Sequence, residues 1–171
     1  MVEMELLGVQ VEMPSNSPLM LLKETAAPGR VLPVVIDTPE AQAIYRGIER
    51  IRMARPLTHD LMKILLDEVG ATVTRVTVTE LRERTFFAEI EMDVGGTTHV
   101  VSARPSDAVA LAVRTETPIF ATEEVLAEAG QFIDSETDDE GTEDEPDADP
   151  AELLDEFKQF LDGVSPDDFG A

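Results

Sequence analysis

The sequence predicts an α+β fold in which mixed or antiparallel sheets are combined with about four helices. Apolar stretches interrupted by turn residues occur at the N-terminus and again over residues 72–103. Between and after them lie helix starts marked by proline and hydroxyl residues. An apolar fraction of 43% in 171 residues is sufficient for one buried core.

The N-terminal third reads as three strands followed by a helix. The strands are predicted over 4–13, 19–25 and 31–36, because proline- and glycine-containing turns separate them. Asp37-Thr38-Pro39-Glu40 then supplies an N-cap hydroxyl, a proline at the first helical position and a first-turn acid. This pattern predicts a helix to about Met53 with a basic C-terminal end.

A second helix is predicted from Pro56-Leu57-Thr58 to Gly70. Its apolar residues recur at every fourth position, as Leu61, Leu65 and Val69.

Three further strands are predicted over 72–81, 86–94 and 97–103, with a hairpin at Gly95-Gly96 because both glycines tolerate positive φ. Strict alternation in the middle strand places Ala88 and Ile90 inward. A third helix, running to Arg114, follows Arg104-Pro105-Ser106 and has little polar surface, which indicates a central, buried position. The last helix is expected from about Thr122 to Ala129.

The chain divides by composition into three parts. Residues 1–133 form the predicted domain, with 20 acidic and 12 basic side chains. Residues 134–149 contain no large apolar residue and are predicted to be a disordered acidic linker. Residues 150–171 begin with an amphipathic helix. Its apolar stripe consists of Leu153, Leu154, Phe157, Phe160, Leu161 and Val164.

Charge and cysteine content restrict the function classes. The net charge is −23, of which −15 lies in residues 134–171, so tight non-specific binding of nucleic acid by the whole chain is not expected. There is no cysteine, which excludes disulfides and thiolate metal sites. No signal-peptide pattern and no apolar run of membrane-spanning length is present, so we expect a cytoplasmic protein without a membrane partner.

Two segments combine arginine, proline, a hydroxyl and an acid at helix starts. They are Arg55-Pro56-Leu57-Thr58-His59-Asp60 and Arg104-Pro105-Ser106-Asp107. One interpretation is structural, with Thr58 and Ser106 as N-caps and the two acids interacting with the helix dipoles. The other is that both helix starts converge with the arginines around a phosphate, and that His59 acts as a general acid or base.

These segments resemble the bifunctional nuclease domain family. The resemblance spans roughly residues 2–130 and also includes Leu22-Lys23-Glu24 and Thr85-Phe86-Phe87-Ala88. It implies a mixed α+β fold and a nuclease that hydrolyses phosphodiester bonds in RNA and DNA. We therefore take His59, Asp60, Arg104 and Asp107 as catalytic candidates. The candidates for binding RNA or single-stranded DNA are Lys23, Arg55, Thr58 and Ser106.

The cofactor and the partners stay open at this point. The metal ligands are unknown, although a divalent cation such as Mg²⁺ fits the chemistry, and Glu89, Glu91 and Asp93 offer acids on one face of a strand. The alternative to a nuclease is a non-catalytic regulatory or interaction module, whose C-terminal helix docks on a protein partner or on its own domain. A homo-oligomer is a further expectation.

Overall fold

The computed structural model describes residues 1–12 and 15–132, and these residues form four helices and eight strands. The predicted linker, 134–149, and C-terminal segment, 150–171, lie outside the described residues. The elements are β1 (Val2–Glu12), β2 (Ser17–Glu24), β3 (Arg30–Val35), α1 (Thr38–Ile48), α2 (Thr58–Glu68), β4 (Ala71–Arg82), β5 (Thr85–Val94), β6 (Thr97–Ala103), α3 (Pro105–Thr115), β7 (Ile119–Ala121), α4 (Glu123–Ala129) and β8 (Gln131–Phe132). The predicted α+β class is confirmed.

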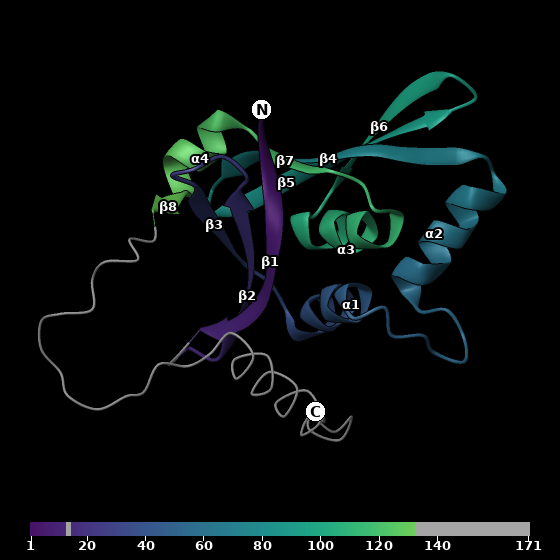
Figure 1. Cartoon of the computed structure of the whole chain (residues 1–171), viewed down its shortest axis with the longest axis horizontal. Helices are drawn as coiled ribbons and strands as arrows, with labels where there is room; N and C mark the ends of the chain where they lie inside the picture. Colours follow the sequence, from purple (N-terminus) through teal and green to yellow (C-terminus); the bar gives the residue numbers. More distant parts are fainter. Residues whose placement is uncertain (13–14, 133–171) are drawn as a thin grey trace, which may run out of the picture.

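All described strands belong to one mixed sheet with the order β6-β5-β4-β7-β1-β2-β3-β8 (Figure 1). Two antiparallel units, β1-β2-β3 and β4-β5-β6, account for most of it. The three residues of β7 join these units, because β7 runs parallel to β4 and antiparallel to β1. A short strand late in the chain therefore makes one sheet out of two.

The predicted hairpin between β5 and β6 is present. Gly95 and Gly96 have φ values of 60° and 85°, the left-handed conformation that a tight two-residue turn requires. The alternation in β5 also has the predicted direction, since Ala88 and Ile90 are buried while Glu89 is exposed.

The core lies where α3 packs against the sheet and against α1 (Figure 1). As predicted, α3 is the central helix, and five consecutive residues from Ala108 to Ala112 are buried. The largest fully buried side chains come from both sheet units and from three helices. They are Met20, Leu22, Leu32, Ile44, Leu111, Leu126, Val76, Val78, Val109 and Val125.

The first helix is shorter than predicted. It ends at Ile48 rather than near Met53, because Arg50 adopts a positive φ of 51° that a helix cannot continue through. The N–H groups of Arg50 and Ile51 turn back to the carbonyls of Gly47 and Arg46. The arginines predicted at the helix end therefore lie mostly in the loop that follows it.

The second helix is present, but the apolar residues that recur at every fourth position face solvent. Leu61, Leu65 and Val69 are 46%, 56% and 67% exposed, while Met62 and Leu66 pack against the core.

No helix in residues 1–12 and 15–132 is long and apolar enough to cross a membrane.

The structural interpretation of Thr58 and Ser106 as N-caps is wrong. The N-caps are Leu57 and Arg104, and neither accepts a side-chain cap hydrogen bond. Thr58 is the first residue of α2, and Ser106 is the second residue of α3. Each helix therefore begins earlier than it would if the hydroxyl residue were its N-cap. At α4, in contrast, Thr122 is the N-cap and its Oγ1 accepts the N–H of Val125.

Candidate functional site

Three helix starts meet at one place and bring together residues distant in sequence. Glu40 lies in the first turn of α1, His59 in the first turn of α2 and Asp107 in the first turn of α3. Since the positive end of a helix dipole favours negative charge, this junction suits carboxylates and other anions.

His59 and Asp107 form the centre of the junction. The His59 Nε2 atom lies 3.2 Å from Asp107 Oδ1, and His59 is only 8% exposed. Burial raises the pKa of Asp107, but hydrogen bonds from Arg104 and His59 outweigh it, so the pKa lies below the usual value. An ionised Asp107 can only accept, so His59 Nε2–H donates this hydrogen bond. In a neutral imidazole with the proton on Nε2, the basic atom is Nδ1.

Arg104 connects Asp107 to a second carboxylate. Its Nε donates to Asp107 Oδ2 at 2.7 Å and its Nη2 to Oδ1 at 3.1 Å, while Nη1 lies 2.8 Å from Glu40 Oε1. The hydrogen bonds to Asp107, followed by those to Glu40, raise the pKa of Arg104, so it stays charged. The other oxygen of Glu40, Oε2, is buried and has no hydrogen-bond partner within the described residues.

A pocket of about 360 Å³ opens beside this His59–Asp107–Arg104–Glu40 network. Three arginines, Arg46, Arg104 and Arg114, and two carboxylates, Glu40 and Asp107, line it. Arg104 is paired with both carboxylates and Arg114 with Asp60, whereas Arg46 forms no ion pair within the described residues. The remaining lining residues are Pro39, Gln42, Ala43, Leu57, Thr58 and His59. We call it the histidine pocket.

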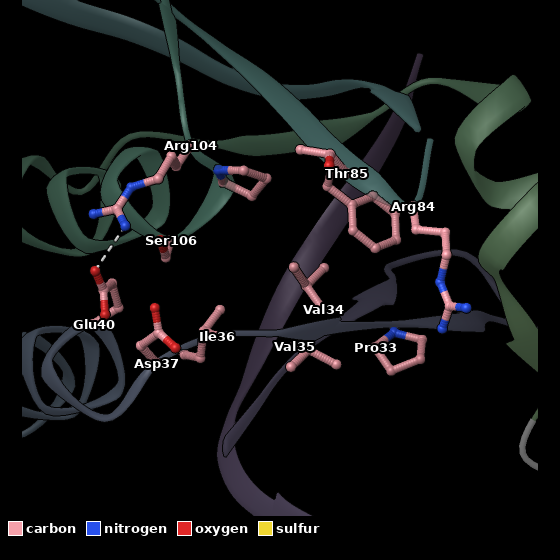
Figure 2. A pocket seen from close by; sticks show the side chains of 12 residues that line it. Pro33, Val34, Val35, Ile36, Asp37, Glu40, Arg84, Thr85, Arg104 and Ser106 are labelled. Atoms are coloured by element: carbon pink, nitrogen blue, oxygen red, sulfur yellow. Dashed lines mark ion pairs between the residues drawn. The ribbon is translucent and has the colours of Figure 1, made fainter. Parts of the chain in front are cut away.

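Four of the eight sequence candidates, His59, Arg104, Asp107 and Thr58, line the histidine pocket. Ser106 lines a neighbouring pocket of about 310 Å³, which shares Arg104 and Glu40 with the first. Figure 2 shows this second pocket, with the Arg104–Glu40 ion pair at one side and Arg84 at the other.

Asp60 is not among the residues that line the histidine pocket. Its Oδ1 accepts Arg114 Nε at 2.6 Å, and its Oδ2 accepts the N–H of Leu57 at 3.0 Å. Burial raises the pKa of Asp60, but the bonds from Arg114 and Leu57 bring it below the usual value. Arg114 also donates to the carbonyls of Ala43 and Ala110, so the pair joins α2 to α1 and α3.

Arg55 and Lys23 are not brought to the junction. Arg55 is exposed in the loop before α2, and Lys23 is exposed near the end of β2, where it pairs in register with Glu5 and Val31. Neither lines the two pockets described above.

Sequence reasoning missed Glu40, Arg46 and Arg114 as site residues. Glu40 carried a signal, because an acid in a first turn is a common dipole partner and can be a ligand as well. Arg46 and Arg114 carried none, since each lies near a helix end where a basic residue is ordinary.

Within the described residues, no group of three or more histidines, aspartates and glutamates is placed to hold a metal ion. The acids of β5 have other partners or face solvent. Glu91 pairs with Arg75, Asp93 accepts the N–H of Gly96, and Glu89 is exposed.

Comparison with known proteins matches residues 20–134 to the model of the bifunctional nuclease domain. An uncharacterized protein of Mycobacterium tuberculosis is 43% identical over 99% of this chain and 98% of its own length. Bifunctional nuclease 1 of Arabidopsis thaliana is 30% identical over 60% of this chain and 32% of its own length. Bifunctional nuclease 2 of Oryza sativa subsp. japonica is 25% identical over 66% of this chain and 35% of its own length.

Proposed function

The chain belongs to the bifunctional nuclease domain family, and we propose that it hydrolyses phosphodiester bonds of RNA and single-stranded DNA in the histidine pocket. The observation that carries the proposal is the bond between His59 and an ionised Asp107 beside a pocket that three arginines line. Hydrolysis requires a base for the attacking water and cations for the charge that develops on phosphorus-bound oxygens. The pocket has both.

Each residue has a defined part in this mechanism. His59 Nδ1 accepts a proton from water as the water oxygen attacks phosphorus, and Asp107 stabilises the resulting imidazolium through Nε2. Arg46 and Arg104 face the substrate phosphate, with Arg104 held in position by Asp107 and Glu40. The bond from phosphorus to the leaving oxygen breaks, that oxygen takes up a proton from solvent, and the imidazolium of His59 returns its proton to solvent.

The experiment compares the two histidines of the chain. The full-length protein, His59→Ala and His99→Ala are assayed on end-labelled RNA and single-stranded DNA. His99 lies exposed on β6 and lines neither pocket, so its variant is the matched control. We expect the His59 variant to lose about 10²-fold or more in rate, as removal of a general base does, and the control to keep its rate.

The same assay reads cation dependence when it is run with Mg²⁺, with Mn²⁺ and with EDTA. Loss of activity in EDTA would support Mg²⁺ as a cofactor, for which Glu40 Oε2 is an available buried oxygen.

Equal rates for the wild-type protein, His59→Ala and His99→Ala would contradict the proposal, because the cleavage would then come from another site or a contaminating enzyme.

A further inference from the structure

A third pocket, of about 620 Å³, lies between the end of α1, the following loop and the start of α2. Its lining carries five cationic side chains, which include Arg50 and Arg52, against two carboxylates. The carboxylates are Asp60 and Glu116, and each is already paired with an arginine. In a chain of net charge −23, this region, here called the arginine groove, is a local concentration of positive charge.

The arginine groove is also apolar where it meets solvent. Ile51, Met53 and Ile64 line it and are 42%, 50% and 44% exposed. Exposed apolar side chains gathered in a concave, positively charged surface mark a site for a partner that is itself apolar and acidic.

We propose that this partner is the chain's own segment 150–164, bound as a helix. Its stripe of leucines, phenylalanines and valine supplies apolar side chains for Ile51, Met53 and Ile64. Its other face carries four acids, among them Asp155 and Glu156, against the single Lys158. The segment thus has the two properties that the arginine groove selects.

The length of the connecting chain permits this contact. The described residues end at Phe132, and the 17 residues 133–149 can extend over roughly 56 Å. A domain of this size is only about 36 Å across, on the scaling of radius of gyration with length.

Tethering favours the chain's own helix over a separate protein. A helix linked by a short connection is present at an effective concentration in the millimolar range, so even a weak contact is populated. The Mycobacterium tuberculosis relative aligns over 99% of this chain, so its alignment extends beyond the family domain, whose match ends at residue 134.

Docking would also regulate the histidine pocket, a consequence that rests on the proposed function. Arg46 and Arg114 line both the histidine pocket and the arginine groove. A bound acidic helix would therefore cover Arg46, which faces the substrate phosphate in the proposed mechanism. It would also place carboxylates beside the histidine pocket, where they would repel the nucleic acid.

The test measures paramagnetic relaxation in the full-length chain and does not depend on activity. The chain lacks cysteine, so Gln159→Cys introduces a single site for a nitroxide on the polar side of the helix. We expect the NMR signals of Ile51, Met53 and Ile64 to lose at least threefold more intensity than those of Leu7 and Val100. Leu7 and Val100 are apolar residues outside the arginine groove and are 51% and 55% exposed. Equal loss at both sets would overturn the proposal.

A charge reversal with a matched control tests the electrostatic part. Arg50→Glu/Arg52→Glu should reduce the groove signal loss at least threefold, while Arg82→Glu/Arg84→Glu, with the same spacing on the β4–β5 turn, should not. All four arginines are exposed, so we expect both variants to fold. Adding Asp155→Arg/Glu156→Arg to the first variant should restore the loss. The same reduction in both arginine variants would overturn the proposal.

Mixed samples separate the chain's own helix from a second copy. Isotope-labelled chains without nitroxide are combined with nitroxide chains without isotope, and no groove signal loss is expected. A loss equal to that in the chain that carries both the isotope and the nitroxide would assign the groove to a homo-oligomer and overturn the proposal.

Discussion

His59 Nε2 and Asp107 Oδ1 lie 3.2 Å apart although 48 positions separate them in the chain. Each belongs to the first turn of a different helix, and the contact exists because α2 and α3 pack with these starts adjacent. Asp107 is bonded to Arg104 as well, so the imidazole, the carboxylate and the guanidinium form one continuous unit.

This unit predicts that Asp107→Asn abolishes most of the nuclease activity that we propose, without unfolding the protein. An amide cannot stabilise an imidazolium as a carboxylate does, so the rate should fall by about 10²-fold or more. Single-turnover cleavage, with circular dichroism as the check on folding, measures the effect. If the variant cleaves at the wild-type rate, Asp107 has no part in the chemistry.

The Asp60–Arg114 pair predicts a stability effect rather than a purely kinetic one. Arg114 is 8% exposed and joins three helices, so Asp60→Asn leaves a buried charge unpaired and should cost about 1–3 kcal/mol. Lys63→Met breaks the exposed Lys63–Asp67 pair on the same helix and should cost at most about 0.5 kcal/mol. Urea unfolding of both variants provides the comparison, and equal losses would contradict a structural role for Asp60.

Gly47 predicts an exception to the rule that alanine stabilises a helix. A Cβ at this position would lie 2.8 Å from Arg114 Nη1 and 3.1 Å from Val113 Cγ1. Because Arg114 is held by Asp60 and two carbonyls, Gly47→Ala should destabilise, whereas helix propensity alone favours it by about 1 kcal/mol.

The control for Gly47 is the same substitution in an Arg114→Met background, where the obstructing guanidinium is gone. There Gly47→Ala should be neutral or stabilising in urea unfolding. A destabilisation of the same size in both backgrounds would show that Arg114 is not the obstacle.

The lowered pKa values of Asp60 and Asp107 predict a loss of stability in acid. Both carboxyls titrate at lower pH folded than unfolded, so their contribution is complete above the unfolded value of about 4 and is lost below it. The urea midpoint, measured from pH 7 to pH 3, should therefore fall below about pH 4. The fall should be smaller in Asp60→Asn/Asp107→Asn than in the wild type, and identical curves would argue against both ion pairs.

Two leucines predict opposite outcomes for one substitution. Leu111 is 1% exposed in the central helix, and Leu111→Ala should cost about 2–5 kcal/mol by leaving a cavity. Leu65 is 56% exposed on α2, and Leu65→Ala should change the free energy of unfolding by at most about 0.5 kcal/mol. A large loss at Leu65 would mean that this face of α2 is covered in solution.

Local sequence signals were sufficient for most secondary structure. The hairpin at Gly95-Gly96 and the buried helix α3 were predicted because their causes are local: two turn residues that tolerate positive φ, and a helix with almost no polar face. The end of α1 was not predicted. Arg50 adopts the left-handed conformation there, and an arginine does not signal a helix end as a glycine at that position would.

The candidate site was predictable only in part. His59, Arg104 and Asp107 stood out by residue type at helix starts, but their mutual contact could not be read from the chain. Asp60 looked equivalent to Asp107 in sequence. The structure distinguishes them, because Asp60 pairs with Arg114 whereas Asp107 contacts His59 and lines the histidine pocket.

The sequence by itself determined the α+β class, the buried character of α3 and the strong acidity of the C-terminal segment, all of which depend on composition and short-range periodicity. Only the tertiary structure decided that one sheet forms and that three helix starts meet. β7 joins the two sheet units with three residues, too few to show a periodicity of their own. The junction of Glu40, His59 and Asp107 depends on how α1, α2 and α3 pack, and packing is a property of contacts between distant segments.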